Sequence, residues 1–542
     1  MAVTQALPDV GASPRATAGR PRPPLAFELL FILALVVVAA HALTNLFGPY
    51  GFQRDEFLYF AMGRHLRLWG MDFPPAIALL SEAIRRLGDS MVVIRLVPAL
   101  AHGLLVILAG LLARNFGGGR FAQALAAVSV AITSLFLRAG NLFQPTVLDQ
   151  LTWTLALLAL TRIGRSAEED GGNGDPVAWL GLGIAAGLGL LTKFSIGFLA
   201  VGMFVGLLLS PQRRVLLTRW PLEAMLLGLL IGSPSIVGQV QLGFPVVGQM
   251  RDLQTYQLVH VGYSVYLLDQ LMMFGPVILL AIFGVLHLLL GRSARGFRAV
   301  AWTCLATFAL LLGLHGKAYY IGPIYPTLVA AGAAALELWT AAMAGRAVGR
   351  VTGYVLRALV LVAVLAYGIG GLPMGLPILA PSDMARYAAE IGMTPAVRTN
   401  TGEHLRLPQD YADMIGWPEE AAAVARAYKA LPPDKQAQAV VIGSSYGHAG
   451  AIDYYGKRYG LPPAISPVSS YWFWGPGDKP GNVAVVLGGD SASLASSFRV
   501  VRPIGRMVNP WGVPEEQHAG IFVAEQPYKT LQQVWPSWKG RN

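Results

Sequence analysis

The sequence predicts an α-helical membrane protein with many spanning helices, followed by a small α/β domain. Of its 542 residues, 54% are hydrophobic and 13% are charged, and the mean hydropathy is +0.51. Soluble domains carry about 25% charged residues, so this composition favours a lipid bilayer as the surroundings of most of the chain. The apolar residues are gathered into long runs, and these runs stop near residue 373.

A spanning helix needs about 20 apolar residues, and about eleven runs approach this length. They lie near residues 27–46, 91–113, 121–137, 147–163, 177–192, 194–210, 222–240, 268–290, 299–314, 321–343 and 355–372. Together they predict a transmembrane domain over residues 25–372. Residues 1–24 are rich in Pro, Ala and Arg and predict a disordered cytoplasmic tail. Because the first run is long enough to span and no cleavage pattern stands out, we expect an uncleaved anchor.

The net charge of +11 is explained by cationic loops on one side of the membrane. Arginines recur in alternate connections: Arg114, Arg120, Arg162, Arg165, Arg213, Arg214, Arg219, Arg292, Arg295, Arg298, Arg346, Arg350 and Arg357. They place the N-terminus in the cytoplasm, in a bacterial inner membrane. The first outer loop, residues 47–90, breaks this pattern with five arginines of its own. Long or structured loops weaken the charge rule, and these cations could instead serve an anionic ligand. No basic stripe alternates with stacking aromatics, so no nucleic-acid partner is expected.

An odd number of spans places residues 373–542 outside the cytoplasm. Strands are predicted near 439–443, 483–487, 498–501 and 520–524, with helices over 447–459 and 490–497, which indicates a small α/β domain. The turn at 443–447 could cradle a phosphate or simply connect a strand to a helix. The single cysteine, Cys304, excludes an internal disulfide and a cysteine-based metal site. No metal is predicted from residue spacing, although carboxylates at the site could attract a divalent cation.

Two adjacent carboxylates, Asp55 and Glu56, follow the first apolar run. Carboxylates at the mouth of a membrane helix are costly unless they are hydrated, paired or functional. Neighbours on a helix point about 100° apart. One acid could therefore face a cavity while the other caps a helix or pairs with Arg54 or Arg64. Simple solvation at the interface is the alternative interpretation.

A third acid, Asp149, lies on the same outer side. Pro145 favours a helix start, which would place Asp149 in the first turn, where the helix dipole favours an anion. Helix capping alone could explain this residue. However, Asp55, Glu56 and Asp149 all lie at outer ends of spans that could converge on one cavity, and we predict them as the catalytic acids.

Lysines approach from the same side. Lys193 lies between two spans, and Lys317 lies at a tight outer turn before a helix. A lysine is a compact charge suited to phosphate, although it can also extend toward lipid headgroups. We expect Lys317 to bind a phosphate, with Arg64, Lys193 and Arg54 as further candidates.

The order and sidedness of these motifs resemble glycosyltransferase family 39. This branch of the GT-C superfamily includes protein O-mannosyltransferases and is similar to the aminoarabinose transferase of lipid A. The resemblance covers residues 25–372, and the C-terminal tail resembles those of uncharacterised bacterial members. The motifs are Arg54-Asp55-Glu56, Trp69-Gly-x-Asp72-x-Pro74-Pro75, the helix with Asp149, and Lys317-x-Tyr-Tyr-x-x-Pro-x-Tyr-Pro.

The resemblance implies a GT-C fold and transfer of a sugar from a polyprenyl-phosphate donor, with inversion, outside the cytoplasm. It implies that Asp55 matches the catalytic acidic position of the first loop. Many relatives carry Lys or His before the Pro-Pro pair, where this chain has Phe73. The phosphate contact is therefore expected from Lys317. No cofactor is predicted apart from the donor itself.

The acceptor would be a glycan, a lipid or a protein. The candidates for contact with the sugar or the acceptor are Tyr59, Asp72, Tyr319, Tyr320, Trp472 and Trp474. The aromatic loop around Trp472 could stack on sugars, pack against the membrane domain or dip into lipid headgroups. His448 is expected to be structural. A transporter or flippase is the alternative function, although such proteins place polar residues near the midplane and show internal repeats. A non-catalytic envelope protein is a third interpretation.

Overall fold

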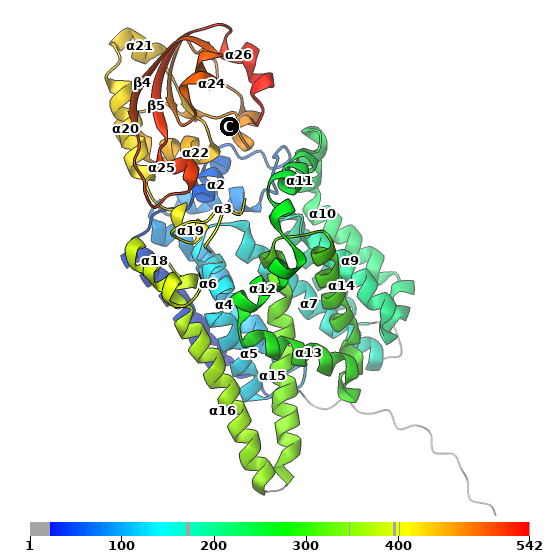
Figure 1. Ribbon diagram of the computed structural model, residues 1–542. Coiled ribbons are helices and arrows are strands. Elements are labelled where there is room, and N and C mark those ends of the chain that lie inside the picture. Colours follow the sequence, from blue (N-terminus) through cyan, green and yellow to red (C-terminus); the bar gives the residue numbers. More distant parts are fainter. Residues whose placement is uncertain (1–21, 170–173, 346, 394–396, 400, 541–542) are drawn as a thin grey trace, which may run out of the picture.

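The computed structural model describes residues 22–169, 174–345, 347–393, 397–399 and 401–540. A bundle of long helices carries a small α/β domain at one end (Figure 1). The predicted fold class is therefore confirmed. The predicted disordered tail, residues 1–24, lies outside the described residues except for its last three positions.

The bundle contains a helix or a bent helix pair at each predicted apolar run. Its helices are α1 (Phe27–Phe47), α4 (Met91–Asn115), α5 (Arg120–Ile132), α6 (Ser134–Asn141), α7 (Pro145–Glu169), α8 (Pro176–Thr192), α9 (Ile196–Leu209), α10 (Trp220–Gln241), α12 (Tyr263–Phe274), α13 (Val277–Leu290), α14 (Arg298–Gly313), α15 (Tyr325–Ala342) and α16 (Ala347–Gly370). Within the described residues, six helices are long and apolar enough to span a membrane, or up to nine if each bent pair is one span. The multi-pass membrane character is clear, whereas the number of eleven spans is not confirmed.

Short helices connect these spans. They are η1 (Pro211–Leu217), α11 (Pro245–Tyr256), η2 (Leu258–His260), η3 (Arg292–Phe297), η4 (Ala318–Ile324) and η5 (Met343–Gly345). In Figure 1, α11 extends the bundle toward the α/β domain.

Two bent pairs shape the end of the bundle nearest the α/β domain. Helices α5 and α6 meet at 60°, and α12 and α13 meet at 105°. The second break falls at Gly275, which has φ +48°, followed by Pro276. Glycine tolerates this backbone, and proline cannot continue the preceding helix. The predicted continuous run 268–290 is therefore broken, and a Cβ at Gly275 would lie 2.5 Å from the ring of Tyr367.

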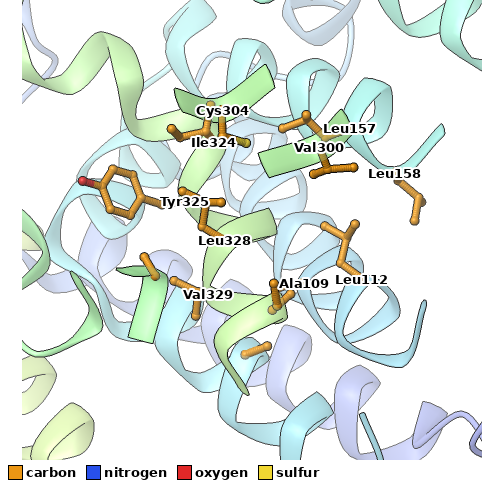
Figure 2. Close-up of a cluster of buried hydrophobic side chains, with 14 of the residues drawn as sticks. Ala109, Leu112, Leu157, Leu158, Val300, Cys304, Ile324, Tyr325, Leu328 and Val329 are labelled. Carbon is orange, nitrogen blue, oxygen red and sulfur yellow. The ribbon is translucent and has the colours of Figure 1, made fainter. Parts of the chain in front are cut away.

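The core of the bundle is formed by α4, α7, α14 and α15. Figure 2 shows Leu112, Leu157, Val300 and Leu328 packed together with Cys304. Helix α15 is 89% buried over its apolar window, compared with 17% for α16. Its many alanines let neighbouring helices approach closely. Helix α16 instead exposes leucine and valine side chains, as a lipid-facing helix must.

Among the described residues, the helix ends and connections that contain the predicted cytoplasmic arginines lie at the end opposite the α/β domain (Figure 1). Arg114 Nε donates to the carbonyl of Pro23 at 2.8 Å. Arg295 pairs with Glu168 at 3.3 Å. The first loop and the C-terminal domain thus share one face of the bundle, and these arginines share the other. Which compartment each face meets stays a prediction.

The first outer loop contains α2 (Arg54–Arg64) and α3 (Ala76–Arg85). After α16, the chain packs over the bundle through α17 (Leu372–Gly375), α18 (Pro381–Glu390) and α19 (Gln409–Ala412). Helix α2 lies directly below the α/β domain, and the two share one hydrophobic cluster (Figure 1).

The α/β domain is built on a five-stranded sheet in the order β2-β1-β3-β5-β4. The strands are β1 (Val440–Gly443), β2 (Ala464–Ile465), β3 (Val483–Leu487), β4 (Phe498–Arg506) and β5 (Gly520–Pro527). Strand β1 is parallel to β2 and β3, and β5 is antiparallel to β3 and β4. All four predicted strands are present. The two-residue β2 was missed because it is too short to carry a pattern.

Helices surround this sheet. They are α20 (Trp417–Lys429), α21 (Pro433–Gln438), α22 (Tyr446–Tyr455), η7 (Gly456–Tyr459), α23 (Ser470–Trp474), α24 (Ser491–Ala495), α25 (Pro514–Gln517), α26 (Leu531–Val534) and η8 (Trp535–Trp538). Helix α22 starts close over the side chain of Arg54: a Cβ at Gly447 would lie 2.6 Å from Arg54 Cγ. The turn at 443–447 is thus covered by protein, which favours the connector interpretation.

Candidate active site

The start of α2 is held by a reciprocal cap. The Gln53 side chain accepts from the backbone amide of Asp55 at 2.8 Å, and Glu56 Oε2 accepts from the amide of Gln53 at 2.7 Å. Such a cap satisfies two amides that the first turn leaves without helical partners. The two predicted acids therefore sit at a helix start whose backbone is fixed.

Glu56 is fully buried and paired. Its carboxylate accepts from Arg95 Nε at 2.9 Å and from Arg95 Nη2 at 2.5 Å. It also accepts from the backbone amide of Phe143 at 2.8 Å. Glu56 and Arg95 are 0% and 1% exposed. This geometry ties the first loop to α4 and to the segment between α6 and α7, and it encloses Glu56, which favours a structural role for this predicted catalytic acid.

Asp55 is half-buried and points toward the C-terminal domain. Its Oδ1 accepts from the hydroxyl of Tyr446 at 2.7 Å. Tyr59 follows one helical turn later and interacts electrostatically with Asp55. Burial raises the pKa of Tyr446, so this phenol stays a hydrogen-bond donor. Of the two adjacent acids, Asp55 is the one that does not take part in the ion pair between Glu56 and Arg95.

Arg54 binds a carboxylate that the sequence analysis missed. It lies 3.7 Å from Asp413 and over the ring of Tyr446, at 5.7 Å from the ring centroid. Burial raises the pKa of Asp413 to about 7, although Arg54 opposes the shift. Asp413 and Tyr446 thus already contact Arg54 beside Asp55. This enclosure is unfavourable for the predicted binding of a phosphate by Arg54.

Lys317 brings the opposite charge to this site. It is half-buried and precedes the apolar segment Ala318–Ala342. Burial lowers the pKa of Lys317 to about 8, while the charge of Asp55 acts in the other direction. The charges of Lys193, Asp410 and Arg54 also act on it. Asp55 and Lys317, which are far apart in the chain, therefore lie close enough for their charges to interact.

Asp149 joins this site through Lys193. Asp149 is 3% exposed, accepts from Ser195 Oγ at 2.7 Å and interacts electrostatically with Lys193. The ammonium of Lys193 lies 5.6 Å and 4.8 Å from the ring centroids of Tyr319 and Tyr320. Helix α7 does begin at Pro145, but Asp149 lies beyond its first turn. The dipole explanation is therefore wrong, and Ser195 and Lys193 are the partners of this acid.

A cavity of about 550 Å³ opens beside Lys317. Its apolar wall includes Leu135, Met272 and Met273, and its polar wall includes Arg138 and Lys317. The lining also includes Ser134, Val261, Val265, Asp269, Tyr319, Tyr367 and Arg398. Both bent helix pairs supply lining residues, because each break turns a short helix toward this space. A cavity lined by both cations and an apolar wall suits an amphiphile with an anionic head.

Four predicted site residues lie elsewhere. Arg64 is at the far end of α2, where it donates to the carbonyl of Asp453 at 3.1 Å and lines a separate cavity of about 320 Å³. Asp72 is buried and accepts from Ser470 Oγ at 2.8 Å and 2.9 Å, and burial raises its pKa to about 6. Trp472 exchanges hydrogen bonds with Trp535, and Trp474 stacks on His65 with ring centroids 4.1 Å apart. Asp72, Trp472 and Trp474 thus join the α/β domain to the first loop or pack within the α/β domain, which favours the packing interpretation of the aromatic loop.

Three further residues contribute to the site and were not predicted from the sequence: Arg95, Asp413 and Tyr446. An arginine inside the apolar run 91–113 was a usable signal, because such a charge needs a buried partner. Asp413 and Tyr446 lie in ordinary polar surroundings of the tail, and no local pattern distinguishes them. Their role comes from the fold, which places the tail over the first loop.

A group of metal-ligand type was not anticipated either. Glu420, His448 and Glu516 are buried in the α/β domain with ligand atoms within 4.8 Å of one another. They come from three separate elements, so residue spacing carried no signal.

Tyr446→Phe tests the contact between the domains. The hydroxyl donates to a carboxylate, and such a bond contributes about 1.5–3 kcal/mol. We expect catalytic turnover to fall roughly 10-fold, and by no more than about 100-fold, and the melting temperature to fall as well, because this bond joins the two domains. Initial rates measured beside Tyr528→Phe, an exposed tyrosine of the same domain, check this. Equal rates in both variants would separate Tyr446 from the function of Asp55.

The helical bundle, with an acidic first loop under a small α/β domain, defines a multi-pass membrane protein of the GT-C fold. Residues 72–237 match the family model described as dolichyl-phosphate-mannose-protein mannosyltransferase, which confirms the resemblance found in the motifs. Asp149 and Lys193 lie within the matched range, and Asp55 and Lys317 lie outside it.

Solved structures share this fold. ArnT from Cupriavidus metallidurans, bound to undecaprenyl phosphate, matches with a TM-score of 0.52 and 15% identity, covering 92% of this chain and 98% of that chain. The oligosaccharyltransferase AglB from Archaeoglobus fulgidus, in complex with an inhibitory peptide and a dolichol-phosphate, matches with a TM-score of 0.50 and 12% identity, covering 85% and 69%. None of the curated proteins compared with the chain matches it.

Proposed function

We propose that this protein is a membrane glycosyltransferase that takes a sugar from a polyprenyl-phosphate donor and passes it to an acceptor outside the cytoplasm. The observation that carries the proposal is a cavity with an apolar wall beside Lys317, whose charge interacts with that of Asp55. The family match and the shared fold support it. The site would face away from the cytoplasm of the inner membrane, because it lies opposite the arginine-rich end.

The donor fits the cavity by its chemistry. The polyprenyl chain would lie along the methionine and leucine wall, and its phosphate would meet Lys317 with Arg138 nearby. The sugar would then extend toward Asp55. An acceptor oxygen attacks the anomeric carbon, and the bond from that carbon to the phosphate oxygen breaks on the opposite face. Fixed cations stabilise the charge that grows on the leaving phosphate.

Asp55 would take the proton from an acceptor hydroxyl, as a general base. If the acceptor is itself a phosphate, no proton needs removal, and Asp55 would orient it instead. Asp149 is too enclosed to meet an acceptor, so we assign it the task of holding Lys193. Glu56 and Arg95 would keep the helix that presents Asp55 in place.

Turnover of a defined donor tests this function. Purified protein would be incubated with a panel of polyprenyl-phosphate pentoses and hexoses, and the released polyprenyl phosphate would be measured. We expect release with at least one donor, including slow hydrolysis without acceptor. A protein that moves labelled lipid-linked sugar across proteoliposomes, yet breaks no glycosyl bond, would instead be a transporter.

Lys317→Met tests the phosphate contact. A hydrogen bond to a charged group contributes about 1.5–3 kcal/mol, so we expect the donor KM to rise about 10- to 100-fold. Lys529→Met, an exposed lysine of the α/β domain, serves as the matched control. If both variants keep the KM of the original protein, another cation holds the phosphate.

The pH profile provides a further test of Lys317. Its pKa of about 8 means that the side chain is charged below this pH and loses its proton above it. We therefore expect kcat/KM, which reports groups of the free enzyme, to fall above about pH 8. Lys317→Arg should move this fall to higher pH, because arginine stays protonated. An unchanged profile in this variant would assign the fall to another group.

A further inference from the structure

The α/β domain contains a buried group of ligand-type side chains outside the candidate active site. His448 is on α22, Glu420 on α20 and Glu516 on α25. His448 Nε2 lies 2.6 Å from Glu516 Oε2 and 3.9 Å from Glu420 Oε2. All three side chains are at most 4% exposed. Three elements far apart in sequence thus place one nitrogen and two carboxylates around a common point.

Glu420 lacks any hydrogen-bond partner for either carboxylate oxygen among the described residues, although it is buried. A buried carboxylate without donors is costly, since it has given up its hydration without compensation. Glu420 Oε2 nevertheless points into the group, 3.9 Å from His448 Nε2. A cation at the centre would supply the missing partner.

The other ring nitrogen of His448 is already oriented. His448 Nδ1 lies 3.0 Å from Ser444 Oγ, and Nε2–H donates to Glu516 Oε2 at 2.6 Å. If a cation replaces the Nε2 proton, Nδ1–H donates to Ser444 and the lone pair of Nε2 binds the cation between the two carboxylates. Histidines that bind metals commonly have their second nitrogen fixed in this way by a neighbouring group.

We propose that Glu420, His448 and Glu516 form a divalent metal site, and that Zn²⁺ is its preferred ion. One imidazole and two carboxylates match the nitrogen and oxygen ligands of zinc, whereas calcium and magnesium favour oxygen alone. Ligands about 2.1 Å from a tetrahedral ion lie about 3.4 Å apart. The observed separations lie on both sides of this value, so small side-chain rotations bring the atoms into position. A water molecule would complete the coordination.

The site would stiffen the part of the domain that meets Asp55. His448 is on the first turn of α22, two residues after Tyr446, whose hydroxyl donates to Asp55. Arg54, which pairs with Asp413, interacts electrostatically with both His448 and Glu516. A metal that joins α20, α22 and α25 therefore fixes the helix start that contacts α2. This role is structural and does not depend on which reaction the protein performs.

Metal content of the full-length protein tests the site. Protein purified in detergent without a polyhistidine tag, from cells supplied with zinc, would be dialysed and measured by inductively coupled plasma mass spectrometry. We expect about one zinc per chain. Glu420→Gln should lose the metal and still fold, because amide and carboxylate have the same shape and this carboxylate makes no hydrogen bond. Ser444→Ala should weaken zinc binding about 10- to 100-fold.

The chain offers matched controls. Glu419 and Glu515 are exposed neighbours of the two carboxylate ligands, so Glu419→Gln and Glu515→Gln should retain zinc. Cobalt added to the metal-free protein should give the visible absorption of a tetrahedral site, and Glu516→Gln should abolish it. Original protein that holds no zinc or cobalt, or a Glu420→Gln protein that holds as much as Glu419→Gln, would overturn the proposal.

Discussion

Asp55→Asn is expected to abolish sugar transfer while leaving the protein folded and inserted. Asparagine keeps the shape of the side chain and can still contact Tyr446, but it cannot accept a proton. Loss of a general base typically costs 10²- to 10⁴-fold in rate, about 3–5 kcal/mol of transition-state stabilisation. Release of polyprenyl phosphate under single-turnover conditions measures the effect on chemistry apart from donor binding.

The donor affinity of this variant separates two roles of Asp55. If Asp55 acts as the base, KM for the donor changes little and kcat falls. If Asp55 orients a phosphate acceptor, the acceptor KM changes as well. Asp252→Asn, an exposed acid of α11 at the same end of the bundle, is the control for charge alone. Full activity of Asp55→Asn would refute the proposed site.

The adjacent acids, Asp55 and Glu56, show what local sequence could and could not predict. A helical spacing of about 100° predicted that one acid could face a cavity while the other capped a helix or paired with an arginine. Glu56 does cap α2 and pair with an arginine, whereas Asp55 accepts a hydrogen bond from Tyr446. The partner, however, is Arg95 on α4 rather than Arg54 or Arg64. No local pattern shows which carboxylate an arginine 39 residues away will meet. Its buried ion pair favours a structural role for Glu56 over the predicted catalytic one.

The apolar runs predicted the helices closely because burial in lipid imposes a length on each one. They could not predict the breaks at Thr133 and Gly275, where the chain turns the short helices toward the cavity. The position of the C-terminal tail could not be predicted either. Tyr446 meets Asp55 across 391 residues, and such a contact depends on the docking of the whole α/β domain. Its strands were predictable from their own patterns, whereas its position over α2 was not.

The prediction with the largest effect on stability concerns Glu56 and Arg95. Removing one partner of a buried ion pair leaves an uncompensated charge and costs about 3–5 kcal/mol. We therefore expect Arg95→Leu to lower the melting temperature in detergent strongly and to reduce the folded yield. Glu56→Leu should also destabilise, because it frees Arg95 and the backbone amide of Phe143.

The double variant distinguishes an ion pair from two independent packing losses. With both charges replaced by leucine, no unpaired charge remains, so the combined loss should be smaller than the sum of the single losses. Glu82 and Arg85 provide a surface pair in the same loop, 2.8 Å apart, and Glu82→Gln should change the melting temperature little. Additive losses at Glu56 and Arg95 would show that the two side chains act separately. Asp55 would then need another anchor for the start of α2, because the cap at Gln53 alone does not connect this helix to α4.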